Sequence, residues 1–189
     1  MIQVAFEWKR IAWLPDETWG KQTLPKLLDA GLTRDNLKRS VYIIRLYGDY
    51  CIEYPGGCSP VLYIGEGRFG SRITRHRRWL KELRQLVGNL SFQLCITVPR
   101  FRDDPNVCKD CEAFALQRFK SKFGSAPLWN KQIENRLNED YRYDRKNIDR
   151  IFSTGRRGKF KWSIKPMKTS QFYHNFTRTH RDPINSNVI

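Results

Sequence analysis

The chain has 189 residues, of which 40% are hydrophobic, and a formal net charge of +16 at pH 7. This length favours one well-cored domain with extensions over two ordinary domains, and the hydrophobic content is ordinary for a water-soluble protein. The positive charge predicts a polyanionic partner, and nucleic acid is the first candidate; the alternative is a basic, solvated surface with no specific partner.

Nothing in the sequence predicts membrane attachment. The N-terminus lacks a basic segment followed by a long apolar one, and the longest charge-free run, residues 85–99, is too short and too polar to span a bilayer. The five cysteines, in a chain without a secretion signal, then predict reduced thiols and a cytoplasmic protein.

Residues 1–39 form an N-terminal extension with one or two short helices predicted between Leu24 and Leu37. We expect this segment to pack on the core. Its tryptophans have two possible roles, because aromatic side chains pack into cores and also stack on unpaired bases. They are Trp8, Trp13 and Trp19.

Two predicted strands follow, and each carries a tyrosine. Residues 41–47 alternate in a way that places Tyr42 on one face, and residues 61–65 form a second strand that carries Tyr63. The connection over residues 48–60 contains the turn sequence Pro55-Gly56-Gly57 and predicts a long hairpin.

A helix is predicted from an N-cap at Ser71 to about Val87, after a glycine-rich turn. The helical pattern places Arg72 and His76 one turn apart, at the edge of the apolar face. Because burying a charge beside the core is costly, these two side chains need a partner or a function. The apolar face comprises Ile73, Leu80, Leu83 and Val87, and the outward basic residues are Arg75, Arg77, Arg78 and Lys81.

A third strand over residues 92–98 precedes a second long helix, predicted from about residue 103 to Phe123 with a stop at Gly124. Glu112 is an acid on the apolar stripe of that helix. An inward glutamate can simply pair with a neighbouring arginine, or it can be functional. Asn130 follows at a break, where asparagine is also an ordinary turn residue.

The remainder is a C-terminal extension over residues 132–189. Residues 131–150 predict a mixed-charge helix with solvated faces, and the chain after Ser153 mixes basic and aromatic residues. This mixture suits contact with a phosphate backbone together with stacking on bases, although packing on the domain would equally account for the aromatic residues. The predicted nucleic-acid-binding residues are Arg68, Arg75, Arg78, Arg156, Arg157, Lys159 and Lys161.

Taken together, the polar residues match the motif order of a known group: the sequence resembles the GIY-YIG nuclease superfamily over residues 40–131. Ser40-Val41-Tyr42 stands where the family has Gly-Ile-Tyr, and Tyr63-Ile64-Gly65 is the second motif unaltered. Two departures are the serine at position 40 and the long gap between the tyrosines, which implies a hairpin insertion. The remaining matches are Arg72, His76, Glu112 and Asn130.

The resemblance implies a small α/β (α+β) domain with a three-stranded, mainly antiparallel sheet flanked by helices. It also implies a divalent-metal-dependent DNA endonuclease, with Mg²⁺ or Mn²⁺ held by Glu112 and one of the two tyrosines as general base. Arg72 would bind the phosphate, His76 would orient a tyrosine or accept a proton, and Asn130 would support the site. A site-specific, restriction-like enzyme is the expected setting, and cutting both strands would favour a homodimer.

Three alternatives stay open. The protein could be a structure-specific or single-strand nuclease of the same superfamily, or a nucleic-acid-binding module with a vestigial site. Separately, a C-x-x-C pair could combine with two earlier cysteines in a four-thiolate zinc site. The cysteines concerned are Cys51, Cys58, Cys108 and Cys111.

Overall fold

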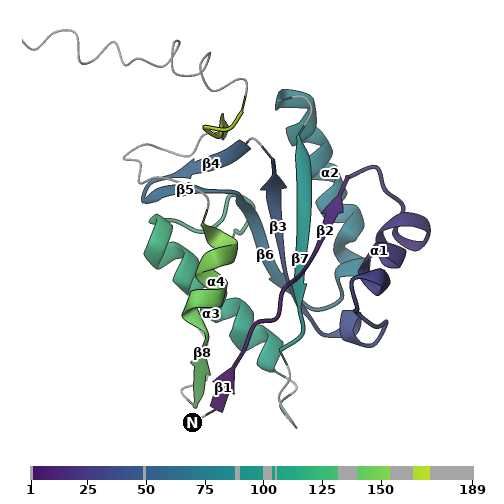
Figure 1. Ribbon diagram of the computed structural model, residues 1–189, viewed down its shortest axis with the longest axis vertical. Coiled ribbons are helices and arrows are strands. Elements are labelled where there is room, and N and C mark those ends of the chain that lie inside the picture. The colour runs from purple at the N-terminus through teal and green to yellow at the C-terminus, as the bar shows by residue number, and fades with distance from the viewer. Residues whose placement is uncertain are drawn as a thin grey trace, which may run out of the picture.

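The computed structural model describes residues 2–48, 50–87, 90–99, 104, 106–131, 140–153 and 164–170. Its centre is an antiparallel sheet of four strands: β2 (Lys9–Trp13), β3 (Val41–Tyr47), β6 (Val61–Glu66) and β7 (Ser91–Thr97). The strand order is β2-β7-β3-β6, so β2 and β6 form the edges (Figure 1). The predicted mixture of helices with mainly antiparallel strands is confirmed.

The prediction of three strands is wrong, because the N-terminal segment supplies β2 to this sheet. Its residues alternate, with Ile11 and Trp13 buried and their neighbours exposed. The strand is short and begins with two charges, so the alternation was too brief to recognise. Trp13 is fully buried, and Trp8 and Trp19 are partly buried against the core.

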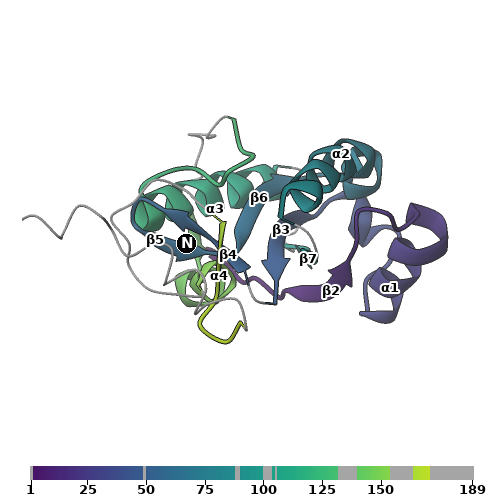
Figure 2. The ribbon, with the colours of Figure 1, turned by 90° about the horizontal axis from the view of Figure 1, so that it is seen from above.

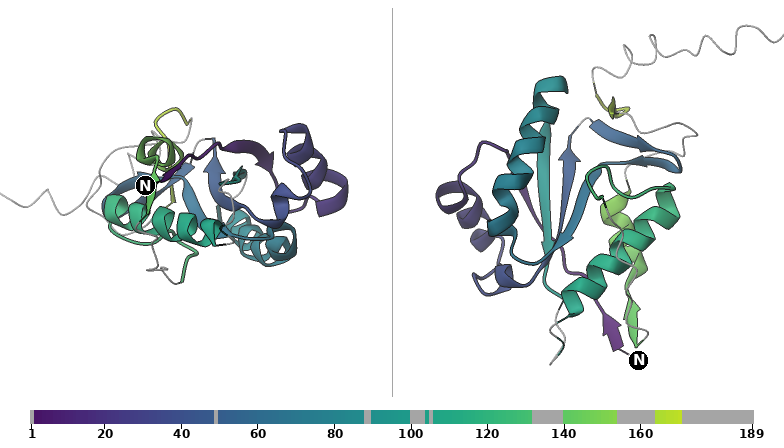
Figure 3. Two further views of the ribbon diagram at one scale, coloured as in Figure 1. Left: turned by 90° about the horizontal axis from the view of Figure 1, so that it is seen from below. Right: turned by 180° about the vertical axis from the view of Figure 1, so that it is seen from behind.

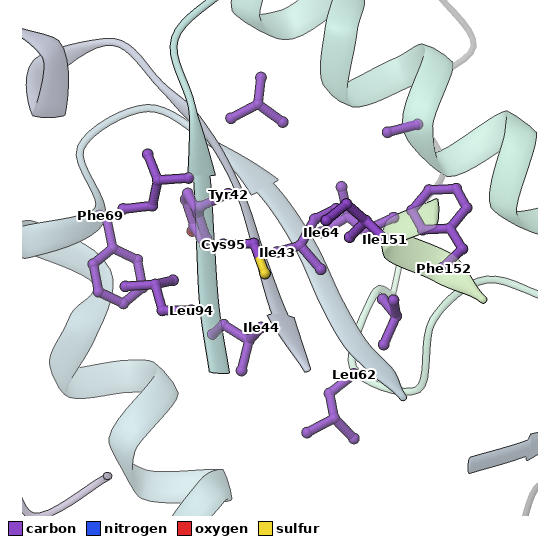
Figure 4. Packing of buried hydrophobic residues seen from close by; sticks show 14 of the residues in the cluster. Tyr42, Ile43, Ile44, Leu62, Ile64, Phe69, Leu94, Cys95, Ile151 and Phe152 are labelled. Atoms are coloured by element: carbon purple, nitrogen blue, oxygen red, sulfur yellow. The ribbon is translucent and has the colours of Figure 1, made fainter. Parts of the chain in front are cut away.

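The two faces of the sheet carry different helices. Helix α2 (Phe69–Val87) covers one face, whereas α3 (Val107–Phe123) and α4 (Arg145–Phe152) lie on the other, as seen from above in Figure 2. The register pairs Tyr42 with Gly65 and Ile44 with Tyr63, so both tyrosines face α2. Ile43 points to the opposite side, toward α4 (Figure 4).

The helix boundaries depart slightly from prediction. Helix α2 begins at Phe69, two residues before the expected N-cap, and Gly70 lies inside its first turn against the Trp19 ring. A Cβ atom at Gly70 would lie 2.8 Å from Cζ2 of Trp19, which explains the small residue there. Helix α3 ends as predicted at Gly124, which has a φ of 77°.

The long connection between the tyrosine strands is a hairpin, as predicted. It consists of β4 (Tyr50–Tyr54) and β5 (Gly57–Ser59) joined by a turn at Pro55 and Gly56. A third strand, β9 (Ile164–Pro166), pairs with β4 to complete a small second sheet. The turn docks on the end of α3, because the Gly56 N–H donates to the carbonyl of Phe123 at 2.9 Å.

The helix predicted over residues 131–150 is confirmed only for its last part, because α4 begins at Arg145 and a strand precedes it. Residues 132–139 lie outside the described ranges, β8 (Tyr141–Tyr143) pairs in parallel with β1 (Ile2–Val4), and α4 follows (Figure 3). Helix α4 is too short for its spacing to be visible among its charges. Its buried residues are Ile148, Ile151 and Phe152.

The N-terminal segment also contains the short helices that were expected. A π-helical turn (Trp19–Thr23) leads into α1 (Leu24–Asp29), and a 3₁₀ turn (Asn36–Lys38) precedes β3. None of the helices in the described ranges is long and apolar enough to cross a bilayer.

Candidate active site

A hydrogen bond between two buried side chains forms the centre of the site. Oη of Tyr42 lies 3.0 Å from Nε2 of His76. Strand β3 supplies the tyrosine and α2 supplies the histidine, 34 residues later in the chain. Tyr42 has no exposed surface and His76 is only 2% exposed. The helix therefore places His76 toward the sheet, where the hydrophobic pattern placed it.

Tyr63 completes an aromatic cluster with these two residues. Its ring stacks on Tyr42 with centroids 5.9 Å apart and lies 4.7 Å from the His76 ring. Gly65 makes this packing possible, because a Cβ atom there would lie 2.6 Å from Cε1 of Tyr63 and 2.8 Å from Oη of Tyr42. Glycine is thus required by the close approach of the two rings, and not only by a turn.

The protonation states follow from burial. Burial raises the pKa of Tyr42 above its ordinary value, and the charge and hydrogen bonding of Tyr63 raise it further, against the opposing influence of Arg72. Burial lowers the pKa of His76 to about 4, helped by the positive charges of Arg72 and Arg75. At neutral pH the phenol is therefore protonated and the imidazole is neutral.

Arg72 stands at the mouth of this cluster. Its side chain is 44% exposed, so it lies farther out than the edge of the buried face on which it was predicted. Its guanidinium acts electrostatically on both Tyr42 and Tyr63, and Nη2 lies 3.9 Å from Oε1 of Glu66. The long guanidinium side chain reaches the end of β6 while its charge remains in water.

Glu66 is a site residue that the sequence did not reveal. It ends β6, its side chain is 20% exposed, and the glycines on either side suggested only a turn. In the sequence, the one sign of its role is that an acid directly follows the predicted strand that carries a tyrosine. Gly67 follows with a φ of 92°, and its N–H donates to the carbonyl of Ser40 at 2.8 Å. Ser40 itself is fully buried in this turn.

Asn130 binds the free edge of β6. Its Oδ1 accepts from the N–H of Ile64 at 2.9 Å, and its Nδ2 donates to the Ile64 carbonyl at 2.8 Å. The adjacent N–H of Trp129 donates to the carbonyl of Leu62 at 3.0 Å. These bonds replace a neighbouring strand and fix the backbone on both sides of Tyr63. The contacts suit the supporting role expected for Asn130.

Glu112 is not part of the aromatic cluster. It is half-buried on α3, which covers the opposite face of the sheet (Figure 2). Glu66, at the end of β6, lies close to residues on both faces of the sheet. On the α2 side it faces Arg72. On the other side, burial raises the pKa of Cys108 to about 12 and the charge of Glu66 contributes to that rise. Cys108 lies one helical turn before Glu112.

The donor side chains of the structure bear on the predicted metal site. Within the described ranges, no three His, Cys, Asp or Glu side chains gather closely enough to hold an ion. Those ranges include all the cysteines of the zinc alternative, which are buried, so a four-thiolate site gains no support. Mg²⁺ binds through few carboxylates and keeps several waters, so a half-buried carboxylate such as Glu112 fits it in kind.

The basic residues of α2 divide into two groups. Arg75 and Arg78, together with Arg68 directly before the helix, are exposed, as a nucleic-acid contact requires. Arg77 instead donates to the carbonyls of Pro15 and Asp16, and Lys81 and Arg84 pair with the Asp16 carboxylate. The outward surface predicted for α2 is thus partly covered by the N-terminal segment. Four predicted contacts lie outside the described residues: Arg156, Arg157, Lys159 and Lys161.

Comparisons with family models, with curated proteins and with solved structures give no match to this chain. The functional inference therefore depends on the residues of the site and on their arrangement.

Proposed function

We propose that this protein is a divalent-metal-dependent endonuclease that hydrolyses phosphodiester bonds in DNA. The observation that supports this most is the hydrogen bond between Tyr42 and His76, beside the exposed guanidinium of Arg72. A phenol joined to a neutral imidazole can move a proton, and a guanidinium can bind a phosphate. The net charge of +16 agrees with a polyanionic substrate.

The arrangement of the tyrosines suggests how a proton would move. Tyr63 is half-buried, so a water molecule can reach it, whereas Tyr42 is fully enclosed behind it. Tyr63 stacks on Tyr42 and influences its pKa, and Tyr42 bonds in turn to the unprotonated imidazole of His76. In this proposal Tyr63 accepts the proton of an attacking water and gives its own hydroxyl proton to Tyr42, which in turn gives its hydroxyl proton to Nε2 of His76.

Arg72 would bind the phosphate that is cleaved. Its separation of 3.9 Å from Glu66 is longer than a hydrogen bond, so phosphate oxygens can replace that carboxylate with shorter, charge-assisted bonds. Glu112 would hold Mg²⁺ or Mn²⁺, an ion that supplies charge stabilisation to the phosphate and to the leaving oxygen. Asn130 holds β6, and therefore Tyr63, in position.

Cleavage of supercoiled plasmid DNA with Mg²⁺ or Mn²⁺ tests this proposal. We expect the wild-type protein to nick or linearise the plasmid, and Glu112→Ala to lower the rate by about 10²-fold or more. Glu7→Ala, which removes an exposed acid elsewhere, is the matched control and should cut normally. Failure of the wild type to cut with any divalent metal contradicts the proposal and leaves a nucleic-acid-binding module.

Mapping of the product ends then determines the type of enzyme. A restriction-like enzyme gives discrete ends at one sequence of a linear duplex. A ragged spread of ends on the same duplex argues against sequence specificity and favours recognition of DNA structure.

A further inference from the structure

A hollow of about 210 Å³ opens beside Tyr63, on the same face of the sheet as α2. Aromatic side chains form its walls, and basic side chains from α2 and from the segment after Trp129 lie around it. The aromatic residues are Tyr63, Trp79 and Trp129, and the basic residues are Arg75, Arg78 and Lys131. His76 also lines this hollow, so it adjoins the candidate active site directly.

The aromatic walls are held firmly. Trp79 and Trp129 stack with centroids 4.8 Å apart and an interplanar angle of 19°. Trp79 is buried in the core, while Trp129 and Tyr63 are half-buried and keep part of their ring surfaces accessible. The Trp129 backbone is anchored to β6 through Leu62. A planar aromatic ligand would therefore meet preformed apolar surfaces.

The size and charge of the hollow restrict what it can accept. A volume of 210 Å³ corresponds to about seven water molecules and lies below the roughly 300–1,000 Å³ of sites that enclose a whole ligand. It therefore suits one planar ring system whose remaining groups stay outside. Three basic side chains and one acid, Glu82, line the hollow, so those outside groups would be anionic. A nucleobase, whose aromatic face can stack and whose sugar carries phosphates, has this chemistry.

We propose that this hollow receives a single DNA base that has left its stack next to the phosphodiester to be cleaved. The inference deepens the proposed function and rests on it, because Tyr63 and His76 belong to both the hollow and the site. It defines the substrate class as DNA with a nucleotide that is unpaired or easily unpaired. Stacking of a base on aromatic side chains favours binding whatever the sequence, and a base without a partner is the least costly to displace.

Binding measured without catalysis tests this inference separately from the nuclease proposal. Two DNA duplexes of equal length each carry one 2-aminopurine, either paired or as a single-nucleotide bulge, and EDTA removes divalent metals. We expect the wild-type protein to bind the bulged duplex about 5–150-fold more tightly than the paired one. Stacking should also quench the 2-aminopurine fluorescence of the bulge.

Variants of Trp129 assign the preference to the hollow. Trp129→Ala should bring the affinity ratio close to one, and Trp129→Tyr, which restores an aromatic face, should keep the preference. Trp129→Leu retains an apolar contact with Trp79 and serves where the alanine variant does not fold. Tyr47→Ala, which removes an aromatic residue 53% exposed on β3, is the matched control and should bind as the wild type does.

Equal wild-type affinity for the two duplexes overturns the inference, and so does a preference that survives in a folded Trp129→Ala or Trp129→Leu variant. Both results are independent of cleavage, because the assay contains no metal. A protein that prefers the bulge but never cuts DNA contradicts the nuclease proposal alone.

Discussion

Two buried tyrosines on different parts of the molecule differ in what their hydroxyl groups can do. Tyr42 lies on the α2 side of the sheet, and Tyr54 lies on the hairpin side, against Phe119 and Phe123 of α3. Both have no exposed surface, and burial is the main cause that raises the pKa of each. Burial alone therefore does not separate them.

The difference lies in their hydrogen-bond partners. The Tyr54 hydroxyl donates to the carbonyl of Val61 and accepts from the N–H of Leu128, and neither backbone group changes protonation. Tyr42 instead bonds to the imidazole of His76 beside the charge of Arg72. A buried hydroxyl that bonds to backbone groups fastens the chain, whereas one that bonds to a titratable side chain can also exchange a proton.

Removing the Tyr42 hydroxyl should have the largest effect on DNA cleavage. Tyr42→Phe should lower the rate of DNA cleavage by about 10²–10⁴-fold, because the connection between Tyr63 and His76 is lost. Single-turnover cleavage of a DNA duplex measures the effect, and circular dichroism checks the fold. A variant that cuts at the wild-type rate would show that Tyr42 is as structural as Tyr54.

Crowding the α2 side should have the next largest effect. Gly65→Ala would place a Cβ atom within 2.8 Å of both tyrosine rings, and relieving that overlap should cost about 3 kcal/mol of unfolding free energy. Gly20→Ala is the matched control, because nothing lies within 4 Å of a Cβ atom there and its stability should not fall. Urea denaturation measures both, and equal stabilities would show that the ring packing is loose.

Removing the hydroxyl on the hairpin side should act on stability and not on activity. Tyr54→Phe leaves the Leu128 N–H and the Val61 carbonyl without this partner, which should cost about 2–3 kcal/mol. Thermal unfolding measures the loss, and cleavage at a temperature where the variant is folded should stay close to wild type. A strong loss of cleavage rate in the folded variant would show that Tyr54 contributes to activity as well as to stability.

The titratable partner should also give the α2 side a pH dependence of stability. Unfolded histidine gains a proton below its ordinary pKa of 6.5, whereas His76 in the folded protein stays neutral until about pH 4. The free energy of unfolding therefore decreases as the pH falls from 6.5 toward 4. Between pH 7 and pH 5 the decrease is at most about 2 kcal/mol.

Urea denaturation at both pH values measures this loss. His76→Gln should remove the part of the pH-dependent loss of stability that comes from His76. Tyr54→Phe should lose as much stability between pH 7 and pH 5 as the wild type does. Identical losses in the wild type and His76→Gln would show that His76 does not have a depressed pKa.

Much of the fold was predictable because its central elements have regular patterns. Strands β3, β6 and β7 and both long helices were predicted to within a few residues from alternation, helical spacing and glycine stops. Strand β2 was not predicted, and α4 was predicted only as the end of a longer helix, because a short segment with charges at its start carries too few apolar positions to show a period. Their places depend on contacts with distant residues.

The site shows the same limit. Local spacing predicted that His76 faces the core, but it could not give the exposure of Arg72 or the position of Glu112 on a helix that covers the other face of the sheet. Those depend on which face each helix covers. Glu66 and the Trp79–Trp129 pair also become visible only once elements far apart in sequence lie together.

The two hydrogen bonds between the Asn130 side chain and the backbone of Ile64 also determine when the candidate site is complete during synthesis. Asn130 follows Ile64 by 66 residues, so a growing chain contains both tyrosines, Arg72 and His76 well before it contains the residue that binds their strand. Until then the outer edge of β6 is open to pairing with any other strand. The last backbone bonds that protect this edge thus belong to residues made after the whole of α3.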